Sequence, residues 1–148
     1  MPDAPSPLPS PSPVLIYAPI SAGELLDKIS ILAIKLRCLH NADQLDHVRD
    51  EHAALKMIER NHLGMGEEIG PLVQELAAVN QRLWDIEEDI RAHEARQDFG
   101  ESFVALARAV YTCNDQRAAL KHAINTRTGS RLVEEKSYGG GAGTGTTA

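Results

Sequence analysis

Residues 72–91 read LVQELAAVNQRLWDIEEDIR, and this stretch decides the fold class. Its apolar residues recur every three or four positions, which places them on one face of an α-helix, and a β-strand cannot use that spacing. They are Leu72, Leu76, Val79, Leu83, Ile86 and Ile90. The stretch therefore predicts one long amphipathic helix, which also carries the only tryptophan of the chain, Trp84.

A second set of residues lies beside the apolar stripe, on one flank of this helix. Separations of three, four or seven positions give one shared face to Asn80, Trp84, Glu87 and Arg91. In the simplest interpretation Trp84 covers the edge of the core, and Glu87 pairs with Arg91 for about 0.2–0.5 kcal/mol. The other interpretation is a binding face.

The next predicted helix has a buried face that turns polar halfway along. Its apolar positions are Phe99, Phe103, Leu106, Val110 and Cys113. At the same spacing the face continues into Asn114, Arg117 and Lys121, with Asn125 close beside. Because an inward Arg or Lys costs several kcal/mol unless it is paired, these side chains need partners on a neighbouring helix.

A short connection joins these two helices, so we expect them to run antiparallel. That pairing brings Asn80 level with Arg117, and Glu87 within reach of Asn114. We therefore expect a polar layer between the helices, in which Arg117 and Lys121 carry more charge than Glu87 neutralises. Two interpretations stay open: a satisfied buried network that fixes the helix register, and an open site for an anion or small ligand.

The first helix begins with a capping box, Ser21 and Glu24. It is apolar around almost its whole surface, which predicts either a central helix or an oligomer contact. Its polar residues form either a solvated edge or a further part of the polar layer. They are Glu24, Asp27, Lys28 and Lys35.

The sequence predicts an all-α, antiparallel bundle of four main helices, with the hairpin of the third and fourth helices at its centre. Asp43 is the expected cap of the second helix, and Asp98 with Glu101 is the expected capping box of the fourth. The expected boundaries are 22–40, 43–61, 67–71 to a turn near 97–100, and from that turn to 126–129.

The two ends of the chain differ in composition from its middle. Residues 1–13 alternate proline with other residues, and residues 139–148 are Gly, Ala and Thr, so we expect both tails to be disordered. Residues 14–138 are expected to form a single helical domain. Within it, residues 14–19 predict an extended strand that needs a partner, and residues 131–138 are expected to fold back over the bundle.

Composition and charge exclude several classes of partner. The net charge is −6, so a basic surface for nucleic acid is not expected. No apolar run reaches the ~18–20 residues of a membrane span, and the first residues do not have the pattern of a signal peptide. Cys38 and Cys113 predict free thiols in a reducing cytoplasm.

Sequence patterns for metal binding and catalysis are absent. The six histidines form no H-E-x-x-H pair, and there is no Cys-x-x-Cys, G-x-S-x-G or phosphate-binding glycine loop. We therefore assign no catalytic residue, no metal ligand and no cofactor. Glu87, Glu88 and Asp89 are consecutive and point in different directions on a helix, so magnesium would need a second acidic helix, for which Glu24-x-x-Asp27 is the only candidate.

The Glu24-x-x-Asp27 pair is similar to the acid pairs of the all-helical nucleoside-triphosphate pyrophosphohydrolases. That family binds magnesium through E-x-x-E and E-x-x-D pairs on neighbouring helices. Here Glu88 is followed three positions later by Arg91, and Glu87 by Ile90, so the second acid pair is missing. The resemblance implies a magnesium-dependent hydrolase as the alternative to a binding protein.

A broader resemblance rests on four motifs: SAGELLDKISILAIKL at 21–36, VNQRLWDIEEDIR at 79–91, ARAVYTCNDQRAALKHAIN at 107–125 and EEKSY at 134–138. Together they resemble an uncharacterised family of small bacterial proteins, a domain of unknown function, over about residues 20–138. The resemblance implies an association with glycosyltransferase and surface-polysaccharide genes. Its motif positions are Glu24, Asp27, Lys28, Lys35, Asn80, Trp84, Glu87, Arg91, Asn114, Asp115, Arg117, Lys121 and Asn125.

We expect a small binding or interaction module that takes an anionic ligand such as phosphate, a nucleotide or a nucleotide sugar. The alternative is an enzyme acting on a nucleotide or a phosphorylated sugar, and the sequence does not decide between the two. A homodimer is expected from the apolar first helix and residues 14–16. The candidate ligand-binding residues are Lys28, Lys35, Asn80, Trp84, Glu87, Arg91, Asn114, Arg117 and Lys121.

Overall fold

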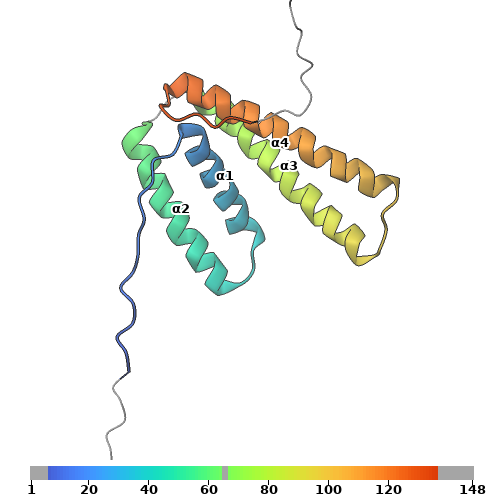
Figure 1. Ribbon diagram of the computed structural model, residues 1–148, viewed down its shortest axis with the longest axis horizontal. Coiled ribbons are helices and arrows are strands. Elements are labelled where there is room, and N and C mark those ends of the chain that lie inside the picture. The colour runs from blue at the N-terminus through green and yellow to red at the C-terminus, as the bar shows by residue number, and fades with distance from the viewer. Residues whose placement is uncertain (1–6, 65–66, 137–148) are drawn as a thin grey trace, which may run out of the picture.

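The computed structural model describes residues 7–64 and 67–136, and this part of the chain folds into α-helices without a strand. Four long helices and one short 3-10 turn follow one another along the sequence (Figure 1). The expected all-α bundle of four main helices is confirmed. The elements are α1 (Ala22–Cys38), α2 (Ala42–His62), η1 (Glu67–Ile69), α3 (Gly70–Ala95) and α4 (Glu101–Thr128).

Local chemistry explains where the helices begin and end. The Ser21 hydroxyl accepts the Glu24 N–H at 3.1 Å, so the predicted cap of α1 is present. Asn41, rather than the expected Asp43, caps α2 by accepting the Gln44 N–H at 3.0 Å. The expected cap of α4 is also wrong, because its N-cap is Gly100 without a side-chain bond. Gly129, with φ of 64°, ends α4 in the left-handed conformation that favours glycine.

The helices form two antiparallel hairpins, α1–α2 and α3–α4, which diverge from one end of the molecule (Figure 1). Helix α1 contacts all three other helices, whereas α2 contacts only α1 among the described elements. The centre of the bundle is therefore α1, and the expectation that the α3–α4 hairpin is central is wrong. The hairpin continues past the end of α1, so its far half consists of two helices only.

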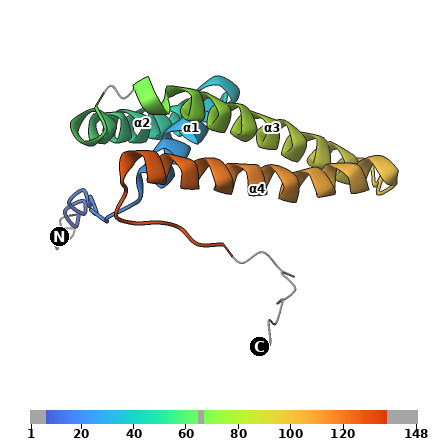
Figure 2. The same cartoon turned by 90° about the horizontal axis from the view of Figure 1, so that it is seen from above.

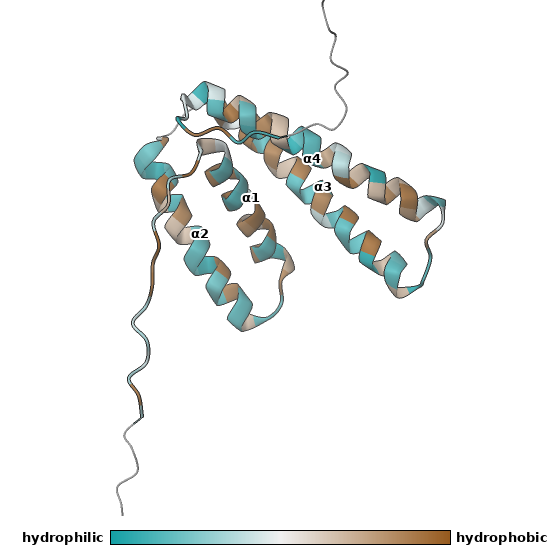
Figure 3. Ribbon diagram, in the orientation of Figure 1, coloured by the Kyte–Doolittle hydropathy of each residue, from teal (hydrophilic) through white to brown (hydrophobic). Residues whose placement is uncertain are grey.

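The core has two parts that follow from this arrangement. The larger part joins all four helices at the end where the hairpins meet, and α1 supplies most of its buried side chains: Ala22, Leu25, Leu26 and Ile29, with Leu76 and Ile124. The smaller part lies along the α3–α4 hairpin around Val79, Ile86 and Cys113. Helix α2 is mostly hydrophilic (Figure 3), and Val48 is its one buried residue. The apolar surface of α1 is thus explained by burial within the chain.

The segments that flank the helices have no regular structure where they are described. Residues 7–20 form no helix or strand and are exposed, so the strand expected at 14–19 is not formed. Residues 131–136 turn back along α4, as expected (Figure 2). The remaining tail positions, 1–6 and 137–148, lie outside the described residues.

Candidate functional site

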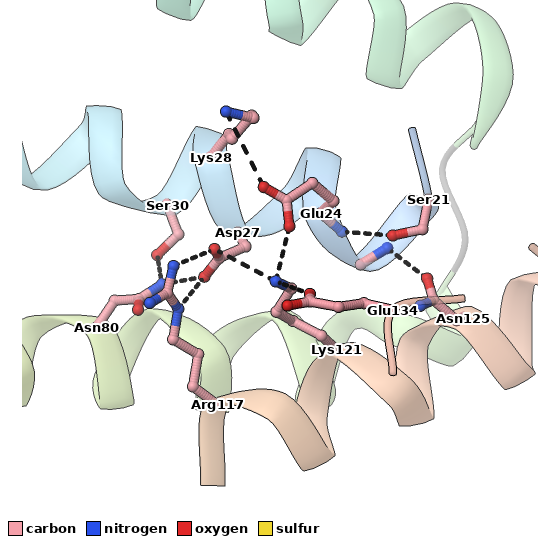
Figure 4. Close-up of polar contacts among 11 residues, drawn as sticks. Ser21, Glu24, Asp27, Lys28, Ser30, Asn80, Arg117, Lys121, Asn125 and Glu134 are labelled. Carbon is pink, nitrogen blue, oxygen red and sulfur yellow. Dashed lines mark hydrogen bonds and ion pairs between the residues drawn. The ribbon is translucent and has the colours of Figure 1, made fainter. Parts of the chain in front are cut away.

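A buried carboxylate on α1 is the centre of the polar layer. Asp27 is 1% exposed and accepts the Nε–H of Arg117 at 2.8 Å and an Nη2–H at 2.5 Å (Figure 4). Such a bidentate pair is stronger than a single hydrogen bond and fixes the direction of both side chains. Asn80 donates through Nδ2 to Asp27 at 2.9 Å and to Ser30 at 3.2 Å. Helices α1, α3 and α4 are therefore joined at one point.

The pKa values of this pair show that it is charged. Burial alone raises the pKa of Asp27, but hydrogen bonds from Arg117 and Asn80, with the charges of Arg117 and Lys121, outweigh burial and hold it below its usual value. The hydrogen bond to Asp27 raises the pKa of Arg117. Both groups keep their charge inside the bundle.

One turn further along α4, Lys121 lies among three carboxylates. Its ammonium donates to Glu24 at 2.7 Å and to Glu134 at 2.5 Å, and it lies 4.0 Å from Asp27 (Figure 4). Its side chain is 9% exposed. Burial works to lower the pKa of Lys121, but the hydrogen bonds to Glu134 and Glu24 raise it overall. Lys121 is thus a charged and fully engaged side chain.

The first turn of α1 is held against the end of α4. The Gly23 N–H donates to the Asn125 amide oxygen at 2.7 Å, and the Ala22 N–H donates to the Ser130 hydroxyl at 3.2 Å. A Cβ added to Gly23 would lie 2.6 Å from the Lys121 carbonyl oxygen. The motif S-A-G-E therefore combines a cap with a glycine that lets two backbones approach closely.

Sequence reasoning paired Arg117 with the wrong acid. Its partner is Asp27, while Glu87 is exposed and lies 3.9 Å from Arg91 in the same helix. The positive surplus expected at Arg117 and Lys121 is absent, because Glu24 and Glu134 also face Lys121. Glu24 and Asp27 were expected only as one of two alternatives, a further part of the polar layer, and Ser30 and Glu134 were missed. The available signal was the pair of acids on a helix that is otherwise apolar almost all round.

A cleft of about 250 Å³ opens between α1, α3 and α4 beside the Asp27–Arg117 pair. Six of the nine candidate residues line it: Asn80, Trp84, Glu87, Arg91, Asn114 and Arg117. The other wall residues are Ile31, Ile34, Leu83 and Glu88. The structure thus brings together the flank of α3 and the polar face of α4 that were selected from spacing.

The three remaining candidates lie outside the cleft. Lys121 is enclosed by carboxylates, and Lys28 is half exposed with its ammonium 4.0 Å from Glu24. Lys35 is half-buried further along α1 and does not line the cleft. These lysines therefore do not belong to the same hollow as the other six candidates.

The floor and the walls of the cleft differ in how their polar groups are satisfied. Asn80 and Arg117, at the floor, are bonded to Asp27. Within the described residues the side chains of Trp84, Glu88 and Asn114 make no hydrogen bond. Arg117 uses two of its five N–H donors on Asp27, so three remain. The cleft combines a fixed floor with walls whose donors and acceptors are available.

The acids of α1 are not arranged to hold magnesium. Glu24 and Asp27 accept from Lys121 and Arg117, which occupy the oxygens that a cation would need. In the described part of the chain no three His, Cys, Asp or Glu residues are grouped as metal ligands. A pyrophosphohydrolase-like acid pair therefore does not fit these residues.

No helix in the described ranges is long and apolar enough to cross a membrane.

Comparison with known proteins identifies a family but no function. Neither the curated proteins nor the solved structures yield a match. The model of a family of unknown function, DUF6165, matches residues 16–148, which is most of the chain and includes every residue of the cleft. The chain belongs to the family of unknown function DUF6165.

Proposed function

We propose that this protein is a non-catalytic binding module whose ligand site is the cleft between α1, α3 and α4. The observation that supports it is the contrast between floor and walls. The Asp27–Arg117 pair fixes the floor, while the side chains of Trp84 and Asn114 on the walls make no hydrogen bond among the described residues. A few convergent polar groups beside apolar and aromatic surface are typical of small-molecule sites.

The ligand that fits these groups is a small anion carrying a ring. The guanidinium groups of Arg91 and Arg117 suit two-pronged contact with phosphate or carboxylate. Arg91 is 82% exposed and lies 3.9 Å from Glu87, so it is available. Trp84 offers a flat face for a ring, and Asn114 and Glu88 can bond hydroxyl groups. We therefore propose a nucleotide, a nucleotide sugar or a phosphorylated sugar.

The size of the cleft limits how much of the ligand it holds. Its volume of about 250 Å³ is below the roughly 300–1,000 Å³ of most ligand pockets. We propose that it takes one end of the ligand, with the rest over the exposed face of α3. The resemblance to proteins associated with surface-polysaccharide and glycosyl-transfer genes favours a sugar phosphate among these ligands. We propose that the protein binds it in the cytoplasm of a bacterium.

An enzyme acting on the same ligands is the alternative, and no observation favours it. No histidine or cysteine lines the cleft. The acids that resemble a magnesium pair are bonded to Arg117 and Lys121.

We also propose that residues 14–138 act as one domain.

We propose in addition that the protein is a homodimer joined through residues 14–17. The side chains of Val14, Leu15, Ile16 and Tyr17 are 71–82% exposed, although all four are apolar or aromatic. A hollow of about 940 Å³ is lined by residues 16–21 together with residues of α1, α2 and the end of α4. The segment therefore has apolar surface that a second copy of the chain can cover.

The binding proposal is tested by titrating the protein with nucleotides, nucleotide sugars and sugar phosphates, with and without magnesium. Trp84 is the only tryptophan, so its fluorescence reports on the cleft directly. Arg91→Gln should weaken binding about tenfold or more, because a hydrogen bond to a charged group is worth about 1.5–3 kcal/mol.

Arg96→Gln is the matched control for Arg91→Gln. Arg96 is an exposed arginine just after α3 that does not line the cleft. Its replacement should leave the affinity unchanged. Equal losses in the two variants, or no ligand that changes Trp84 fluorescence, would contradict the proposed site.

A further inference from the structure

Residues 130–136, here called the strap, run back along α4 after the helix ends (Figures 1 and 2). Polar contacts connect the strap to the bundle, beginning with the Ser130 N–H, which donates to the Asn125 carbonyl oxygen at 2.9 Å. Ser130 accepts the Ala22 N–H at 3.2 Å, Glu134 binds Lys121 at 2.5 Å, and Lys136 binds Asp115 at 3.0 Å. Every residue from 131 to 136 is exposed. Polar contacts rather than apolar burial therefore keep the strap in place.

The carboxylate of Glu134 completes a balanced cluster of charges. Three cations face three carboxylates around the first turns of α1: Lys28, Arg117 and Lys121 against Glu24, Asp27 and Glu134. If the strap leaves, two carboxylates remain for three cations. The cluster then lacks one negative charge at the ammonium of Lys121.

Glu134 is the most replaceable of the three carboxylates at Lys121. Its side chain is 58% exposed, against 32% for Glu24 and 1% for Asp27. Glu24 and Asp27 belong to a packed helix, whereas Glu134 belongs to a segment without buried residues. An oxyanion from solution can therefore replace Glu134 without moving a helix.

We infer that Glu134 is a tethered anion that fills a phosphate-type subsite at Lys121, and that a phosphate-bearing molecule binds there by displacing the strap. Lys121 and Glu134 do not line the cleft between α1, α3 and α4. The subsite is thus separate from the cleft, and it can exist whether or not the cleft binds a ligand. Its displacement also releases the contact of Lys136 with Asp115, next to Asn114 of the cleft wall.

Calorimetric titration of the full chain with inorganic phosphate tests this inference. Glu134→Gln removes the competing charge from an exposed residue, so the variant should fold. It should bind phosphate about tenfold more tightly than the parent. If Glu134 leaves the parent's site open about a tenth of the time, the apparent Kd of the parent is about ten times that of an open site. Glu135→Gln is the matched control, since it removes the same charge from the same segment, and its Kd should equal that of the parent.

Displacement of the strap has its own readout. In nuclear magnetic resonance spectra of the parent, the backbone amide signals of residues 131–136 should move as phosphate is added. In Glu134→Gln they should already occupy the shifted positions. An unchanged Kd in Glu134→Gln, an equal gain in Glu135→Gln, or phosphate binding that leaves the strap signals in place would each overturn the inference. None of these readouts depends on Trp84, so failure of the cleft proposal is recognised separately.

Discussion

At the scale of single residues, the Asp27–Arg117 pair is the most consequential contact. Removing one member of a buried ion pair leaves the other as an uncompensated charge in a medium of low polarity. Among the described residues, Asp27 has one other hydrogen-bond donor within 3 Å, the Asn80 amide. Asn80 cannot neutralise its charge, and Lys121 is 4.0 Å away and shared with two other acids.

Arg117→Met should therefore lower the free energy of unfolding by about 3–5 kcal/mol. Urea denaturation followed by circular dichroism measures this change. Arg91→Met is the control, because Arg91 has an exposed side chain and its partner Glu87, in the same helix, is 3.9 Å away. The free energy of unfolding of this variant should stay within about 1 kcal/mol of the parent's. Similar values for the two variants would mean that Arg117 is hydrated like a surface residue.

At the scale of elements, the approach of α1 to α4 depends on one missing side chain. Gly23→Ala places a methyl group 2.6 Å from the Lys121 carbonyl oxygen, which belongs to helix backbone and cannot rotate away. Overpacking of this kind costs about 1–3 kcal/mol, more than the ~1 kcal/mol that alanine gains in helix propensity. We expect a net fall in melting temperature, measured by calorimetry.

Gly70→Ala is the matched control for the helix contact. Gly70 is also a helical glycine, and an added Cβ finds no neighbouring atom within 4 Å. This variant should stay within about 1 kcal/mol of the parent, because alanine gains helix propensity while the following Pro71 disfavours a helical residue with a Cβ. A Gly23→Ala protein as stable as Gly70→Ala would show that α1 and α4 are not in close contact.

Periodicity predicted the elements but not how they assemble. The apolar repeats predicted α3 and α4, and the short turn predicted their antiparallel pairing, and six of the candidate residues line one cleft. A central position for α1 was one of two alternatives, and the partner of Asp27 was not predictable, because an acid has the same spacing whether its face meets water or Arg117. Glu134 lies in a segment without periodicity, and only the path of the chain after Gly129 brings it to Lys121.

At the scale of the whole molecule, the proposed dimer explains the exposed apolar segment before α1. Light scattering of the full chain at micromolar concentration should give twice the monomer mass. Ile16→Asp should shift the protein to monomers, because it places a charge where the apolar contact is expected. Leu8→Asp is the control: Leu8 is also exposed but lies outside the hollow beside α1 and α2. A monomeric parent would rule out the dimer.

The long-range capping of α1 also has a consequence for how the chain is made. The partners of Ala22, Gly23 and Asp27 lie 108, 102 and 90 residues further along the sequence. At about 5–20 residues per second, the ribosome completes α1 at least several seconds before it produces α4. During that time α1 has first α2 and then α3 to cover it, and Asp27 lacks the charge of Arg117. The central helix of the finished bundle therefore gains its last partner only when the final helix of the chain has been made.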